Sequence, residues 1–246
     1  RRAIASGRPD VRTNCRRAEA DAASGHTSFQ RGMITVVSRS VEFVMSTLLT
    51  EAGHLPIDGD FQAARFTVDE YFGMVSRDAF SNVGRVELLE GMLVRVMTKN
   101  PPHRVALGRT DRALRRLIGE GWHLANQEPL RLTGSAPEPD LTIVRGEIED
   151  YREHHPGVED VGLVIEVADE SIRTDHRKAS MYAGERVADY WIVNLPDRCV
   201  ETFSRPEADA QPPRYAQHDV YREGDSISVN IDGQEFGVVL VDDLLP

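Results

Sequence analysis

The chain has 246 residues, 40% of them hydrophobic, which is enough for one domain with a sizeable core. Its net charge of −11 argues against general affinity for nucleic acid, but residues 1–40 are net basic, so local patches must decide. No run of 18 apolar residues is present, and two cysteines are too few for a disulfide framework. We therefore expect a cytoplasmic protein without a membrane segment.

The first 60 residues show no pattern typical of a folded domain. Residues 1–32 are rich in Arg, Ala, Ser and Gly without periodicity, and the sequence begins with Arg. We expect residues 1–60 to be a disordered leader or a mis-assigned start, with Met33 and Met45 as alternative starts. Residues 61–246 are then expected to form a single domain.

Regular structure is first predicted at the capping box Thr67-Val68-Asp69-Glu70, which begins a helix that ends near Ser76. Residues 85–97 follow and are typical of a hairpin with its turn at Glu90-Gly91. Glu87 sits among apolar neighbours within this hairpin. Its spacing is equally compatible with an inward carboxylate and with a position on the rim.

The next predicted helix runs from His103 to about Ile118, after Pro101-Pro102, and it is unusually rich in arginine. This arginine face is either a solvated surface or a surface that follows phosphates. The arginines concerned are Arg104, Arg109, Arg112, Arg115 and Arg116. After this helix, a short strand is predicted at 127–132.

The segment 161–168 is apolar on both faces except at Glu166, which predicts a central strand with a carboxylate set into it. Burial of an ionised carboxylate costs several kcal/mol without a partner, so Glu166 needs a cation, a metal ion or a proton close by. Candidates for the cation follow in 174–178, which opens a predicted helix that ends near Gly184.

Lysine usage singles out one of these candidates. Only two of the 29 Lys and Arg residues are lysines, Lys99 and Lys178, and Lys178 lies 12 positions after Glu166. Lysine carries a compact ammonium that suits contact with a water or a phosphate. Chance is the alternative explanation for its presence there.

The remaining elements complete an alternating pattern. Residues 189–194 are predicted to form a strand parallel to 161–168, because a strand, a helix and a strand in succession favour a right-handed crossover. Residues 199–203 should pair back on it as a hairpin. Further strands are expected at 214–221, 227–231 and 236–241.

From about Phe66 to Leu245 the chain resembles the Uma-type restriction endonuclease family, bacterial members of the PD-(D/E)xK nuclease superfamily. The resemblance implies an α/β (α+β) class, with a restriction-endonuclease-like mixed β-sheet flanked by helices and extra C-terminal strands. It rests on the stretches 66–71 (FTVDEY), 86–91 (VELLEG), Pro102-His103, 137–141 (PEPDL), 164–168 (VIEVA), Asp175 with Lys178, and 189–193 (DYWIV).

The resemblance also implies a site. Asp140 and Glu166 would be ligands of Mg²⁺ or Mn²⁺, Glu87 would complete the shell or hold a second metal, and Lys178 would position or deprotonate the attacking water. The usual lysine lies two residues after the acid, where this chain has Ala168, so the lysine is displaced to the following helix. Expected substrate-binding residues are His103, Arg104, Gln127 and Asp175, although His103 is equally compatible with a capping or packing role.

The function implied by these residues is metal-dependent endonucleolytic hydrolysis of DNA phosphodiester bonds, with DNA as partner and a homodimer as the form that cuts both strands. One alternative is a catalytically inactive DNA- or protein-binding regulator with the nuclease fold, suggested by the acidic charge and by Ala168. Another is hydrolysis of a different phosphoester, such as a nucleotide. The chain has no GxGxxG or GxxxxGK[ST] motif, so nothing supports a Rossmann or P-loop nucleotide site.

Overall fold

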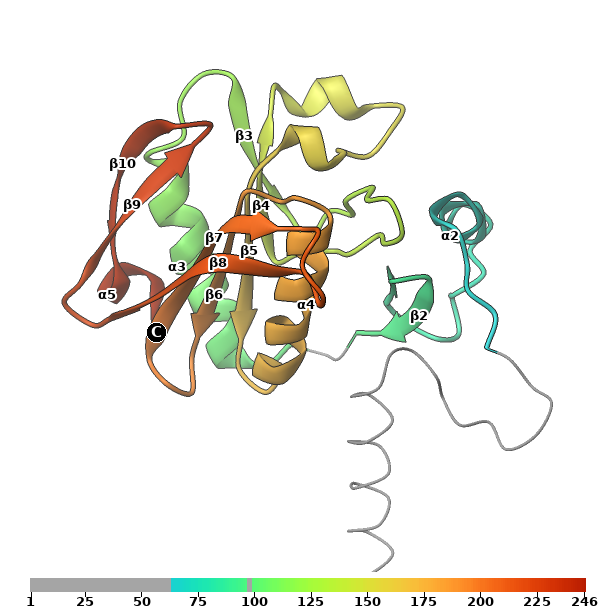
Figure 1. The fold of residues 1–246 in the computed structure, drawn as a ribbon, viewed down its shortest axis with the longest axis horizontal. Coiled ribbons are helices and arrows are strands. Elements are labelled where there is room, and N and C mark those ends of the chain that lie inside the picture. The colour runs from blue at the N-terminus through green and yellow to red at the C-terminus, as the bar shows by residue number, and fades with distance from the viewer. Residues whose placement is uncertain (1–62, 97–98) are drawn as a thin grey trace, which may run out of the picture. The chain divides into compact units, whose positions relative to one another are not determined.

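The computed structural model describes residues 63–96 and 99–246 (Figure 1). Its contacts divide the chain into Arg1–Ala63 and a compact unit, Ala64–Pro246. The predicted leader, residues 1–60, lies outside the described residues, and a single domain from residue 61 stays a prediction. Within the described part of the chain, no helix has both the length and the apolar character needed to cross a membrane.

A six-stranded mixed sheet is the centre of the unit, with its strands in the order β3-β4-β5-β6-β7-β8. β5 and β6 are parallel, as predicted, and all other neighbours are antiparallel. Every residue of β5 is buried, which confirms the two-sided burial predicted for this strand. The six strands are β3 (Trp122–Asn126), β4 (Leu141–Arg145), β5 (Val161–Ala168), β6 (Asp189–Asn194), β7 (Cys199–Glu207) and β8 (Arg214–Arg222).

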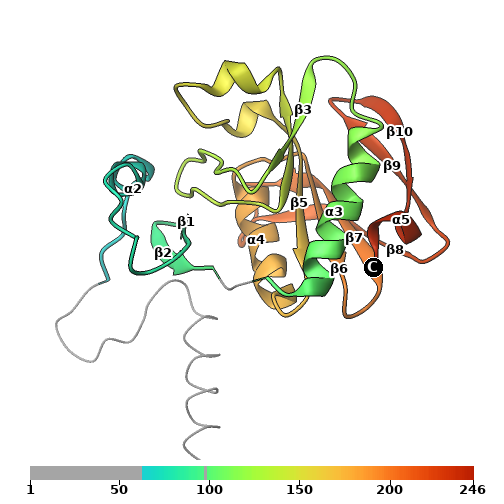
Figure 2. The same ribbon diagram turned by 180° about the vertical axis from the view of Figure 1, so that it is seen from behind.

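The helices cover both faces of this sheet. α4 lies on one face in Figure 1, and α3 lies on the opposite face, which is turned to the viewer in Figure 2. Two antiparallel hairpins, β1-β2 and β9-β10, complete the unit. The elements outside the sheet are α2 (Val68–Val75), β1 (Val86–Leu89), β2 (Met92–Arg95), α3 (Pro101–Arg115), α4 (Ile172–Gly184), β9 (Ser226–Ile231), β10 (Gln234–Leu240) and α5 (Val241–Leu244), with 3₁₀ turns at Ile148–Tyr151 and Val158–Asp160.

The alternation of side chains along β5 assigns one of its faces to each helix. Ile165 and Val167 join the core that includes apolar residues of α3, β9, β10 and α5. Val164 and Ala168 join the core beneath α4. Because side chains two apart in a strand share a face, Glu166 lies on the face that α4 covers.

The short elements before the sheet follow their local signals. The capping box at Thr67 is present, with the Glu70 amide bonded to the Thr67 hydroxyl at 3.2 Å and the Glu70 carboxylate bonded to the Thr67 amide at 2.8 Å. Glu90 and Gly91 form the predicted turn between β1 and β2, with φ values of 49° and 79° that suit a hairpin turn. A bridge between Leu88 and Ala136 fixes this hairpin to the segment that precedes β4.

The strand predicted at 127–132 is wrong, because the strand that pairs with β4 is β3, five residues earlier. Gln127 has a φ of +54°, which turns the chain out of the ladder, and Pro129 has no amide to donate. α3 also begins two residues before the predicted start. Asn100 caps it by accepting from the His103 amide at 3.1 Å, and the two prolines occupy the first turn, where no partner for an amide is needed.

The close approach of β5 to the β9-β10 hairpin generates a stability prediction. A Cβ at Gly162 would lie 2.5 Å from Cγ2 of Ile231 and 2.8 Å from the Trp122 ring. Gly162→Ala should therefore lower the free energy of unfolding by roughly 1–3 kcal/mol in urea titrations. Gly108→Ala is the matched control: this helical glycine has open space around it, so an alanine there should raise stability by about 0.5–1 kcal/mol. Equal effects of the two changes would contradict the packing described.

Candidate active site

The buried carboxylate of Glu166 has its cation. Nζ of Lys178 lies 2.8 Å from Oε1 of Glu166 and 3.0 Å from Oε2 of Glu87, and the three side chains are 4–9% exposed. Lys178 thus points inward from α4 and bridges two carboxylates. The position two residues after the acid, Ala168, is filled by packing beneath α4, and the lysine reaches the same face from the helix.

Local sequence explains why α4 delivers this lysine. Asp175, Lys178 and Tyr182 recur at helical spacing and are all buried on the side of α4 that faces the sheet. The hydroxyl of Tyr190 on β6 donates to the carbonyl oxygen of Asp175 at 3.0 Å, and Ser171 donates to the Asp175 carboxylate at 2.6 Å. These bonds fix the first turn of the helix against the sheet.

Asp140 precedes β4 directly and is brought beside Glu166 by the strand register, in which Leu141 pairs with Ile165. Its amide donates to Oε2 of Glu166 at 3.3 Å. Oδ2 of Asp140 accepts from the Val167 amide at 2.9 Å and from Nε2 of His103 at 3.0 Å. The two carboxylates are therefore held side by side at the end of neighbouring strands.

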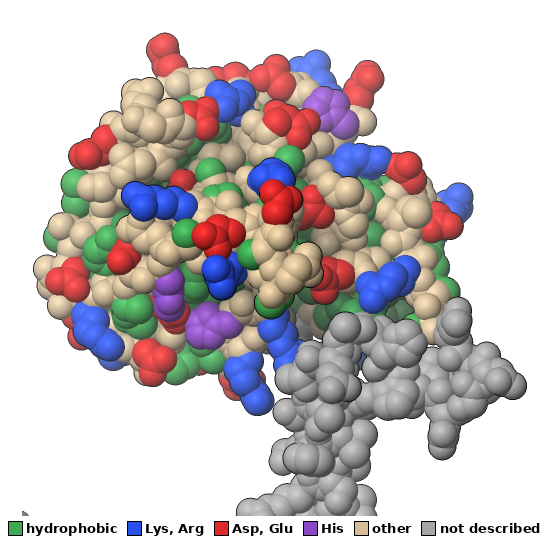
Figure 3. All heavy atoms as spheres, in the orientation of Figure 1, with side chains coloured by type: hydrophobic (Ala, Val, Ile, Leu, Met, Phe, Trp, Pro, Cys, Tyr) green, Lys and Arg blue, Asp and Glu red, His purple; other side chains and the backbone are tan. Residues whose placement is uncertain are grey.

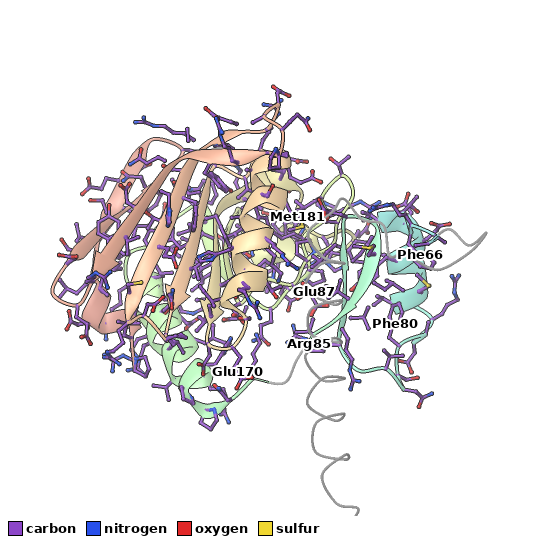
Figure 4. All side chains as sticks on the ribbon, turned by 60° about the horizontal axis from the view of Figure 1, so that its bottom comes forward. Phe66, Phe80, Arg85, Glu87, Glu170 and Met181 are labelled. Atoms are coloured by element: carbon purple, nitrogen blue, oxygen red, sulfur yellow. The ribbon has the colours of Figure 1, made fainter. Side chains whose placement is uncertain are left out.

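The β1-β2 hairpin supplies the third carboxylate. Glu87 is 3% exposed, so of its two possible positions the inward one is observed. Figure 4 shows Glu87 and Arg85 on the side of the hairpin that faces α4. Arg85 forms an ion pair of 2.6 Å with Glu138 and a long contact of 3.4 Å with Oε1 of Gln127. Gln127 in turn donates to Oδ1 of Asp140 at 3.4 Å, so it borders the site.

The electrostatics of Glu166 and Lys178 show an excess of negative charge. Burial raises the pKa of the Glu166 carboxyl to about 8, although the Lys178 ammonium lowers it, and neighbouring carboxylates reinforce the rise. Burial lowers the pKa of Lys178, but Glu166 and Glu87 outweigh it and hold that pKa well above its usual range. The lysine is thus kept protonated, and the cluster retains an additional proton on a carboxyl near neutral pH.

The carboxylates of Asp140 and Asp175 differ in their partners. Burial raises the pKa of Asp140, but the hydrogen bond from His103 and the charge of Lys99 outweigh it and bring the pKa down to about 2. Burial raises the pKa of Asp175 to about 6, against the effect of its hydrogen bond from Ser171. Asp140 is therefore an ionised carboxylate held by hydrogen-bond donors, whereas Asp175 is a weaker acid than Asp140.

These groups lie in a pocket of about 410 Å³. Among the predicted site residues, Glu87, His103, Asp140, Glu166, Asp175 and Lys178 all line it. Arg104 does not line the pocket, since it is exposed on α3. Three basic residues for which no role at the site was predicted, Lys99, Arg85 and Arg95, also line the pocket.

The predicted arginine face of α3 is partly used within the chain. Arg109 donates to the carbonyl oxygen of Asp242 at 2.7 Å, and Arg115 pairs with Asp111 one turn earlier at 2.9 Å. Any phosphate contacts of α3 would therefore come from its remaining exposed arginines. On the opposite side of the molecule, over α4, Figure 3 shows basic and acidic side chains interspersed.

The donor set fits a hard divalent cation in its chemistry. The described residues that line the pocket include seven carboxylates, of which Glu87, Asp140, Glu166 and Asp175 are buried, and two lysine ammoniums. Carboxylate oxygens are the ligands that Mg²⁺ and Mn²⁺ prefer. Within residues 63–96 and 99–246, no three His, Cys, Asp or Glu side chains are arranged to hold a metal ion as they stand. The lysine ammoniums lie against the carboxylates instead, at Glu87, Glu166 and Asp140.

Comparison with known proteins identifies the family of this chain. Residues 68–237 match the family model Uma2, described as "Putative restriction endonuclease", and the chain therefore belongs to this family. A crystal structure from Anabaena variabilis ATCC 29413, titled as a "putative nuclease belonging to DUF820", has a similar fold, with a TM-score of 0.50 and 12% identity. The similarity covers 68% of this chain and 95% of that one. Among curated proteins, none matches the sequence.

The bridge made by Lys178 generates a second stability prediction. Lys178→Met leaves Glu87 and Glu166 buried without their shared ammonium, so the free energy of unfolding at pH 8 should fall by about 3–5 kcal/mol. The double variant Lys178→Met/Glu166→Gln should recover part of this loss, because one of the two buried acidic groups that lost the ammonium is removed.

Lys99→Met is the matched control, since it removes the other lysine of the described site. It should cost less, because Asp140 keeps its bonds from His103 and from the Val167 amide. Urea unfolding of the variants gives the comparison. Equal losses for the two lysines would be inconsistent with a special role of Lys178 in the core.

Proposed function

We propose that this protein is a Mg²⁺- or Mn²⁺-dependent endonuclease that hydrolyses DNA phosphodiester bonds. The observation that carries the proposal is the Lys178 ammonium, which reaches from α4 to Glu166 and Glu87 beside Asp140 in one pocket. Two carboxylates and a lysine are the groups that the superfamily pattern requires. Membership of the restriction endonuclease family supports a nucleic acid substrate.

Asp140, Glu166 and Glu87 would hold the cation. Their shared excess of negative charge, which keeps a proton on the cluster, gives a divalent cation a favourable site. When bound, such a cation would polarise the phosphodiester and acidify water. Binding requires that the lysine ammoniums move away from at least one of the carboxylate oxygens that they now contact.

Lys178 would act as a fixed positive charge and hydrogen-bond donor. Because Glu166 and Glu87 hold its pKa well above the usual range, it is unsuited to accept a proton from water. Of its two expected roles, positioning of the attacking water is therefore favoured over its deprotonation. The same ammonium would also stabilise developing negative charge.

His103 would position Asp140. It is 7% exposed, and its Nε2 is already engaged with Oδ2 of Asp140, so the imidazole is placed to orient the carboxylate and is not directed at a phosphate. This arrangement favours the expected packing role over contact with a substrate phosphate, since His103 also stands in the first turn of α3. Carboxylates that bind a metal are usually hydrogen-bonded by neighbouring groups, as Asp140 is by His103.

The partner and setting belong to the same proposal. DNA would be the substrate, a homodimer would present two sites to the two strands of a duplex, and the bacterial cytoplasm would be the compartment. Dimer formation is supported by the chemistry alone, because one site cuts one strand at a time.

Plasmid cleavage tests the proposal. Wild-type protein with Mn²⁺ or Mg²⁺ should nick or linearise plasmid DNA, and EDTA should abolish the activity. Asp140→Asn and Lys178→Ala should each lower the rate by roughly 100-fold or more, because each removes a preorganised group from the reacting centre. Arg186→Ala, which changes an exposed arginine paired with Asp209, is the control and should cut like wild type.

The outcomes separate the alternatives. Identical cutting by all variants would identify contamination and overturn the proposal. If no DNA is cut, and Asp140→Asn binds DNA as well as wild type without metal, the binding-regulator function is the better one. Release of phosphate or nucleoside from nucleotides, with DNA left intact, would identify a hydrolase of a different phosphoester.

A further inference from the structure

The carboxylate of Asp140 has no vacant acceptor position facing the pocket. Oδ2 accepts from the Val167 amide and from His103, at 2.9 and 3.0 Å. Oδ1 contacts the ammonium of Lys99 and accepts a longer bond of 3.4 Å from Gln127. A cation can therefore bind Asp140 only if one of these donors gives up its place.

The Gln127 contact of 3.4 Å is already longer than a usual hydrogen bond, and of the three closer donors Lys99 is the one that can leave at the smallest cost. The Val167 amide belongs to the central strand β5, and the side chain of His103, on α3, is only 8% exposed. Neither donor can move away without disrupting the fold. The Lys99 side chain is 19% exposed and lines the pocket. It is also long and flexible, and electrostatic repulsion from an arriving divalent cation would act on its ammonium directly.

After it leaves, the ammonium cannot go far. Lys99 immediately precedes Asn100, which caps α3 and also donates to Asp169 at 2.6 Å, so the backbone at this point is tied to both helix and loop. The released ammonium would thus remain within the same pocket, which Arg85 and Arg95 also line. Asp169 and Glu170 line this pocket too, so an entering phosphate would compete with their carboxylates for the ammonium.

We propose that Lys99 alternates between two partners: it covers Oδ1 of Asp140 in the metal-free protein, and it binds the substrate phosphate when a divalent cation takes that oxygen. This inference rests on the proposed function and assigns a separate task to each lysine of the described site. Lys178 stays enclosed between the carboxylates of Glu87 and Glu166. Lys99 is bound to the Asp140 carboxylate until the cation displaces it, and it then contacts the substrate.

The proposal predicts that Lys99→Met changes two affinities in opposite directions, that for Mn²⁺ and that for DNA. Mn²⁺ binding, measured by calorimetry without DNA, should become about 5- to 10-fold tighter because a competing ammonium is gone. Binding of a fluorescent oligonucleotide in Ca²⁺ should become weaker, and the slope of log K against log salt concentration should fall by about one, the change expected for one lost phosphate contact.

Two variants control the experiment. Lys99→Arg keeps a cation and should retain most of the salt slope, whereas Arg186→Ala should match wild type in both measurements. Unchanged or weaker Mn²⁺ binding by Lys99→Met would overturn the proposal, as would an unchanged salt slope. If wild type cuts DNA but Lys99→Met shows either result, the inference alone fails. If wild type binds neither Mn²⁺ nor oligonucleotide, the proposed function fails and this inference fails with it.

Discussion

The ammonium of Lys178, enclosed between Glu87 and Glu166, is the constraint on which the rest of the site depends. The three residues come from a hairpin, a central strand and a helix, and each is almost fully buried. Two buried carboxylates without this cation would cost several kcal/mol each, so the hairpin and α4 must both be docked before the site is stable. The same contact that stabilises the fold also brings together the groups that the proposed activity requires.

The two-sided burial of β5 determines which groups can meet. Its alternating side chains give one face to the core of α3 and the other to α4, and Glu166 falls on the α4 face. Asp140 joins it through the register of β4, and His103 reaches Asp140 from α3. Both layers of helices therefore contribute to one site at the end of the central strands. The resulting surplus of carboxylates over ammoniums is what a divalent cation would neutralise.

The sequence predicted those parts of the site that leave a local signature. Glu166 interrupts an apolar run, so a buried carboxylate and its need for a cation could be inferred, and the scarcity of lysine pointed to Lys178. The same scarcity could have pointed to Lys99, but its contact with Asp140 depends on how the chain enters α3, which no periodicity reports. The strand expected at 127–132 failed for a related reason. Its apolar residues Leu130 and Leu132 are buried, but the positive φ of Gln127 turns the chain away from the hydrogen bonds that pair β3 with β4.

The displacement of the lysine from the strand to the helix has a physical reason in the packing. Position 168 lies beneath α4 in an apolar core, where Ala168 is fully buried. A lysine there would have to thread its side chain between strand and helix, whereas a lysine on α4 approaches Glu166 from above. As a consequence, the position of the Lys178 ammonium relative to Glu166 depends on how α4 packs on the sheet. The bond from the Tyr190 hydroxyl to the Asp175 carbonyl, one turn before Lys178, ties that docking to the same sheet that carries Glu166.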